Sequence, residues 1–149
     1  MTDPRVLEAQ QWVNSVYGEV PGFVLAPEDG KTGWDTMHAL TRALQVELGI
    51  TALSSNFGPG TLGRLTAYGP IAPGETNSNL VQIIQSACFC KGYDTGGITG
   101  TYGPGTAGAI SRLHADMGLP SDGTLPAKVF KGLLTMDAYV LLPGGNTAM

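Results

Sequence analysis

The sequence is short of basic residues, of long apolar runs and of an apolar N-terminus, and each shortage excludes a class of protein. Eight Lys plus Arg stand against twelve Asp plus Glu, without a basic cluster, so we expect no nucleic-acid partner. The longest apolar run, Ala138 to Leu142, is far below the ~18 residues of a membrane-spanning helix, so we expect no membrane partner. Charged side chains within Met1 to Gln11 leave no apolar stretch for a signal peptide, so we expect any export to follow another route.

Cysteine is also scarce. Only Cys88 and Cys90 occur, two positions apart in a segment of helical period. On a helix their side chains diverge by about 200°, which disfavours a disulfide between them. A C-x-C pair without a second pair is a weak metal signal. We interpret both as small core or surface residues, and we expect no metal and no other cofactor.

Glycine, by contrast, is abundant and regularly placed. Four segments with apolar residues at helical spacing each stop at a glycine, the residue that closes a helix in the left-handed conformation. Two shorter helices are expected where apolar residues again recur at three and four. The sequence therefore predicts an all-α fold. The expected helices are Val6 to Tyr17, Thr36 to Leu48, Leu80 to Lys91 and Thr106 to Met117, which stop before Gly18, Gly49, Gly92 and Gly118, and the shorter Thr61 to Tyr68 and Pro126 to Leu134.

The two halves of the chain repeat one another. Asn56 to Leu65 matches Thr101 to Ile110 in an aromatic-Gly-Pro-Gly-Thr unit that opens a helix. Gln11 and Gln85 each lie seven residues before the glycine that ends their helix. Residues 69–78, rich in turn formers, predict a linker between the halves.

Catalysis within this chain is not expected from the sequence. A glycosidase needs two carboxyl groups on either side of the scissile bond, and no spacing here pairs two acidic residues. His114 and Asp116 have the spacing of some zinc ligands, but residues two apart on a helix point away from each other. We interpret His114, like His38, as a partly exposed helix residue. Neither a G-x-S-x-G nucleophile turn nor a phosphate-binding G-x-x-x-x-G-K-[S/T] loop occurs.

At the level of turns, the second half resembles the peptidoglycan-binding-like domain, a small three-helix module of bacterial and phage cell-wall hydrolases. The resemblance rests on Gln85, on Gly100 to Thr106 and on Gly118 to Gly123, although Thr99 stands where the family has aspartate. The first half resembles a longer variant, with Glu28 to Thr36 as its first turn, and the likeness extends to about residue 142. It implies two tandem three-helix domains with long loops. We expect them at residues 1–68 and 79–142, with a linker at 69–78 and a tail at 143–149, and packed together because such small units are marginal alone.

The resemblance implies noncatalytic binding to peptidoglycan, through its glycan or its stem peptide. The chain would then bring a fused or associated cell-wall hydrolase or endolysin to its substrate in the cell wall. The hydrolase would belong to Gram-positive bacteria or their phages. Two alternatives remain open. One is a structural or adaptor module that holds protein partners in a phage or secretion particle, and the other is an enzyme.

Candidate ligand contacts come from the turns. Aromatic faces hold sugar rings, and helix N-termini receive carboxylates such as those of stem peptides. Phe57 and Tyr102, the aromatics of the repeated unit, are better interpreted as core plugs, although Tyr102 stays a candidate contact. Trp34 is either an exposed platform or is packed against the first helix. The candidates are Trp34, Asp35, Tyr93, Asp94, Tyr102 and Thr106.

Overall fold

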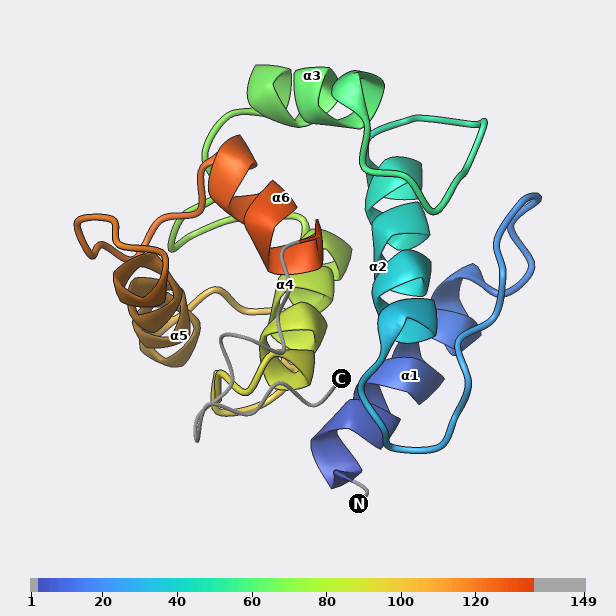
Figure 1. Ribbon diagram of the computed structural model, residues 1–149, viewed down its shortest axis with the longest axis horizontal. Helices are drawn as coiled ribbons and strands as arrows, with labels where there is room; N and C mark the ends of the chain where they lie inside the picture. The colour runs from blue at the N-terminus through green and yellow to red at the C-terminus, as the bar shows by residue number, and fades with distance from the viewer. Residues whose placement is uncertain (1–2, 136–149) are drawn as a thin grey trace.

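The computed structural model describes residues 3–135, and within that range the chain forms six helices and no strand (Figure 1). The predicted all-α fold is confirmed. The first five helices begin two residues earlier than predicted, and in α1, α3 and α5 that first residue is a proline, whose fixed φ suits the first helical position. The predicted segments beyond residue 135, including the tail, lie outside the described residues. The helices are α1 (Pro4–Tyr17), α2 (Trp34–Glu47), α3 (Pro59–Tyr68), α4 (Ser78–Cys90), α5 (Pro104–Asp116) and α6 (Ala127–Thr135).

Helix α4 is the centre of the structure. It packs against α1 and α2 on one side and against α5 and α6 on the other, as Figure 1 shows. Every side chain from Ile83 to Cys90 is buried, which is expected of a helix that is apolar around most of its circumference. One continuous hydrophobic cluster contains side chains from both halves. The two halves pack together, as expected; their division into two domains stays a prediction.

The segment between the halves is anchored to the second half. Ile71 is fully buried and forms an antiparallel bridge with Leu125, in the connection between α5 and α6. The two backbone hydrogen bonds measure 3.0 Å from the Ile71 amide and 2.7 Å from the Leu125 amide. Asn77 then caps α4, because its side-chain oxygen accepts from the Leu80 amide at 3.0 Å. The predicted linker is thus fixed at both of its ends.

The first helix of each half holds the following turn with a buried glutamine. Gln10 donates to the hydroxyl oxygen of Thr36 at 2.9 Å, and its side-chain oxygen accepts from the amides of Asp29 and Gly30. Gln85 makes the same set of bonds: it donates to the Thr106 hydroxyl oxygen at 3.0 Å and accepts from the amides of Thr99 and Gly100. These two side chains define the correspondence between the halves.

The predicted pairing of Gln11 with Gln85 is therefore wrong by one residue, since Gln11 is exposed and Gln10 is buried. The closing glycines explain the error. Gly92 has φ of 86°, whereas Gly18 has φ of −59° and ends α1 in the right-handed conformation. Counting back from the two glycines therefore compares helix ends of different geometry. Gly49 and Gly118 do have the predicted left-handed conformation.

The second helix of each half uses a related contact. Gln45 donates to the hydroxyl oxygen of Thr61 at 3.2 Å and accepts from the Ser54 amide at 2.9 Å. His114 stands at the equivalent place, because the carbonyls of Gln45 and His114 both accept the amide hydrogen bond that closes the helix end. The two His114 ring nitrogens lie 3.2 Å and 2.8 Å from backbone carbonyl oxygens of the next turn. With 4% of its surface exposed, His114 is not the partly exposed residue that we predicted.

Candidate binding site

A hollow of about 250 Å³ lies in front of α2 and brings together two of the predicted contact residues. Trp34 is the first residue of α2, and its side chain is 39% exposed. Its ring stacks on His38, one turn along the same helix, with centroids 6.0 Å apart and planes inclined by 26°. Asp35 follows on the rim and is exposed. The hollow is lined by Pro27, Asp29, Lys31, Thr32, Gly33, Trp34, Asp35 and Thr36.

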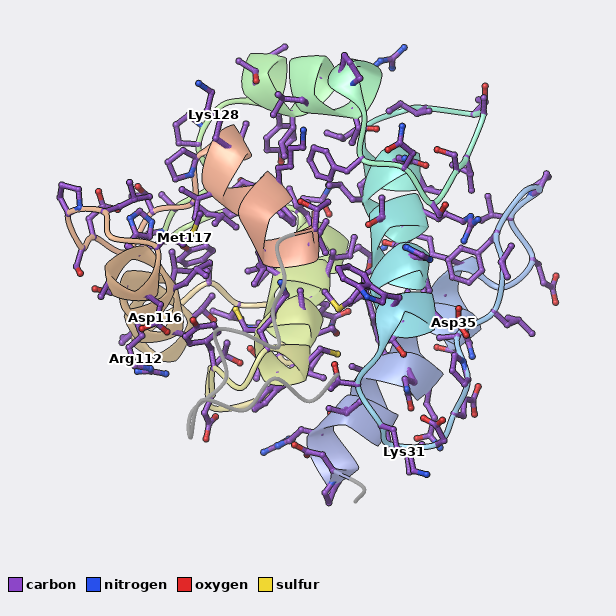
Figure 2. All side chains as sticks on the ribbon, viewed as in Figure 1. Lys31, Asp35, Arg112, Asp116, Met117 and Lys128 are labelled. Atoms are coloured by element: carbon purple, nitrogen blue, oxygen red, sulfur yellow. The ribbon has the colours of Figure 1, made fainter. Side chains whose placement is uncertain are left out.

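The hollow opens onto the N-terminus of α2. Gly33 is the N-cap and has no side chain to bond the first amides of the helix. Such amides carry a partial positive charge that favours a carboxylate ligand. Lys31 adds an exposed ammonium at the rim, and Figure 2 shows Lys31 and Asp35 near the start of α2.

Asp29 is a fixed negative charge beside the same hollow. A backbone hydrogen bond from Lys31 and a side-chain hydrogen bond from Gln10 hold the pKa of its carboxyl below the usual value. Asp29 and Asp35 therefore oppose Lys31 on this surface. The hollow offers donors at the helix end and an aromatic face, with acidic side chains at its border.

At the start of α5 the backbone of Thr95 approaches the helix closely. Gly105 precedes Thr106 as Asp35 precedes Thr36, so the two positions correspond. A Cβ atom at Gly105 would lie only 2.3 Å from the carbonyl oxygen of Thr95, whereas nothing lies within 4 Å of a Cβ at either N-cap glycine, Gly33 or Gly103. The second half therefore has no room for a side chain at the position of Asp35, while the N-cap glycines of both helices stay uncovered.

The predicted contacts of the second half lie elsewhere. Tyr93 is buried and donates to the carboxylate of Asp116, and burial raises the pKa of its phenol. Asp94 is exposed, and its side chain accepts from the Gly96 amide at 2.7 Å. Neither residue lines the hollow at α2. A ligand contact by either stays a prediction.

Tyr102 and Thr106 serve the packing of the second half. Tyr102 is buried and donates to the carbonyl of Gly123, and Thr106 is buried against Gln85. Phe57 is buried at the matching place in the first half, so the interpretation of both aromatics as core plugs is confirmed. A ligand contact at Tyr102 or Thr106 stays untested.

Two further hollows occur in the first half, and sequence reasoning predicted neither. One, of about 310 Å³, lies at the start of α3 and is lined by Thr61, Arg64 and residues of the preceding turn. The other, of about 260 Å³, is mainly apolar and includes Val20, Val46 and Leu53. Sequence reasoning also missed Lys31 and Arg42. The signal for Arg42 was its spacing of four from His38 and eight from Trp34, on a helix with most of its other positions apolar.

Cys88 and Cys90 are buried free thiols, and burial raises the pKa of each to about 12. No group of three or more His, Cys, Asp or Glu side chains within residues 3–135 is placed to hold a metal ion. In the same range no helix has the length and hydropathy to cross a membrane.

Comparison with known families settles what the chain is related to. Residues 2–99 match the model of a family described as the FadG/YbfG PGDB-like domain, and this match covers about two thirds of the chain. The chain belongs to this family. A second family model, described as "Putative peptidoglycan binding domain", matches residues 77–131. The resemblance to peptidoglycan-binding-like domains is therefore confirmed, and the two matches overlap over α4.

Two members of the FadG/YbfG family are proteins of Bacillus subtilis (strain 168). The uncharacterized protein FadG is 53% identical over 147 residues, which are 97% of this chain and 25% of FadG. The uncharacterized protein YbfG is 41% identical over 148 residues, which are 99% of this chain and 20% of YbfG. The chain thus spans a quarter or less of the curated relatives that it matches. No solved structure matches it.

Proposed function

We propose that this chain is a noncatalytic peptidoglycan-binding region that makes its contact at the start of α2. The observation that carries the proposal is the open hollow at Trp34, where an exposed aromatic ring adjoins helix amides without a side-chain cap. Indole faces stack on sugar rings, and such amides donate hydrogen bonds to carboxylates. The match of residues 77–131 to a peptidoglycan-binding family supports the same ligand class.

Targeting is the biological role that follows from this proposal. A wall-binding region raises the local concentration of any linked domain at the cell wall, as linked binding modules do in general. We therefore propose a cell-wall hydrolase or endolysin, fused or associated, as the molecule that this chain delivers. On this proposal the chain acts at the bacterial cell wall.

Sedimentation with purified sacculi tests the proposal. The 149-residue chain is expected to co-sediment with insoluble peptidoglycan and to release neither reducing sugar nor free amino groups from it. Trp34→Ala is expected to weaken this binding by about tenfold while changing the free energy of unfolding little, since the ring is partly exposed. Phe57→Ala is the contrasting variant, because a buried aromatic ring costs ~3 to 5 kcal/mol on removal.

A chain that stays wholly in the supernatant contradicts the proposal. Release of sugar or amino groups would instead indicate catalysis. A loss of stability in Trp34→Ala equal to that in Phe57→Ala would show that Trp34 serves the core rather than a ligand.

An adaptor role is the second candidate, and one observation favours it. The loop between α1 and α2 presents Val24 and Leu25 with more than half of each side chain exposed, close in sequence to the apolar hollow at Val20. Exposed apolar surface of this kind is typical of protein contacts. Val24→Ser with Leu25→Ser should leave sacculus binding unchanged if peptidoglycan is the ligand, and should abolish partner binding if the chain is an adaptor.

A further inference from the structure

The solvent-facing part of α2 is a narrow stripe. Eight of its fourteen residues are buried, among them Thr36, Met37 and the run from Ala39 to Thr41. The residues that reach solvent recur at helical spacing and share one side of the helix. They are Trp34, Asp35, His38, Arg42 and Val46, while the sixth residue that is not buried, Glu47, lies apart and bonds Tyr17 and Asn77.

Arg42 is a cation for which the described protein supplies no anion. The ion pairs within residues 3–135 join Arg5 to Glu8 and His114 to Asp122, and no hydrogen bond of Arg42 occurs there. Its Nε atom is enclosed without a hydrogen-bond partner, while the residue as a whole stays partly exposed. Because the Arg42 guanidinium has no acceptor among the described residues, its terminal nitrogens can donate hydrogen bonds to an acceptor outside the protein.

The spacing of Arg42 and Trp34 along α2 suits a ligand that extends along the helix. The step of eight residues from Trp34 to Arg42 along α2 corresponds to about 12 Å of helix rise. The Trp34 ring stacked on His38 forms an aromatic platform at the start of the stripe, and Arg42 follows His38 one turn further along the helix. A ligand that fits both is a chain of sugar rings with a carboxylate displaced along the strand.

We propose that the α2 stripe binds a glycan strand together with a carboxylate of its stem peptide, with Trp34 and His38 under a sugar ring and Arg42 on the carboxylate. This inference rests on the proposed function and names the part of peptidoglycan that is recognised. Charge complementarity selects this occupant over an uncharged glycan, because Arg42 would lose hydration without gaining an acceptor.

Sacculi with intact carboxylates, compared with sacculi whose carboxylates have been amidated chemically, provide the test. The unmodified chain should bind intact sacculi about tenfold more tightly than amidated ones. Arg42→Gln should lose about tenfold on intact sacculi and most of the preference for them over amidated ones. Arg42→Lys keeps the charge without the planar fork and should retain part of the preference. Lys128→Gln removes an exposed positive charge from α6 and should behave as the unmodified chain.

Each result separates the two proposals. If the unmodified chain binds intact and amidated sacculi equally, or if Arg42→Gln keeps the preference for intact ones, the role of Arg42 is overturned while peptidoglycan binding stands. If the unmodified chain binds neither kind, both proposals fail. Thermal unfolding of Arg42→Gln within a few degrees of the unmodified chain confirms that any loss of affinity is local.

Discussion

The phenol of Tyr17, at the end of α1, donates a 2.6 Å hydrogen bond to Oε2 of Glu47, at the end of α2. The other oxygen of this carboxylate accepts from the side chain of Asn77 at 3.0 Å, just before α4. One carboxylate thus joins the ends of two helices of the first half to the start of the second. Burial, followed by the bond to Glu47, raises the pKa of Tyr17 above its usual value of 10.

Alkaline pH should therefore destabilise the protein. The buried thiols of Cys88 and Cys90 have pKa values raised from 9 to about 12, so above pH 9 the unfolded chain loses protons that the folded chain keeps. Stability from such groups is complete below the unfolded pKa and declines as pH rises toward the folded one. The free energy of unfolding by urea should fall between pH 9 and pH 12. Cys90→Ala should make that fall shallower by up to about 1.4 kcal/mol per pH unit; an unchanged slope would contradict the assignment.

Replacing Gln10 by alanine should be costly and replacing its neighbour should not. Gln10→Ala leaves the buried amide of Gly30 without its acceptor, which costs about 1 to 3 kcal/mol of unfolding free energy. Gln11→Ala changes an exposed side chain and should stay within about 0.5 kcal/mol. Urea denaturation of both variants measures the difference. Equal effects would refute the corrected correspondence between the halves.

Gly60 and Gly105 follow the proline of the same repeated unit, yet alanine should affect them differently. A Cβ at Gly105 would lie 2.3 Å from the Thr95 carbonyl oxygen, and nothing lies within 4 Å of a Cβ at Gly60. Gly105→Ala should therefore lower the melting temperature by several degrees, while Gly60→Ala should leave it unchanged or raise it slightly. Calorimetry of the pair checks this. A tolerated Gly105→Ala would mean that the Thr95 backbone moves away easily.

His114 should accept glutamine better than alanine. The ring fills the place that Gln45 occupies in the first half and faces two backbone carbonyls. His114→Gln retains a donor there, whereas His114→Ala removes every polar contact and leaves a cavity. We expect the alanine variant to lose at least 1 kcal/mol more of unfolding free energy. Two variants of equal stability would show that the ring acts only as packing.

The helices could be predicted because their signals are local. Periodic apolar residues and the closing glycines at Gly49, Gly92 and Gly118 depend on short-range backbone physics, and all six helices followed. The exposure of His114 could not be predicted, because its burial depends on a turn that lies several residues downstream. Arg42 was missed for the opposite reason. Arg42 stands out because no acceptor of the described residues reaches its side chain, and a single sequence does not show which side chains come close in the fold.

The two-sided burial of α4 bears on how such proteins are assembled in evolution. Helix α4 buries apolar side chains against both halves, so separating the halves into two proteins would expose one apolar face of α4 to water. We therefore expect the two halves to be inherited together as one unit. A second half copied alone into another protein would need other residues to cover the face of α4 that α1 and α2 bury.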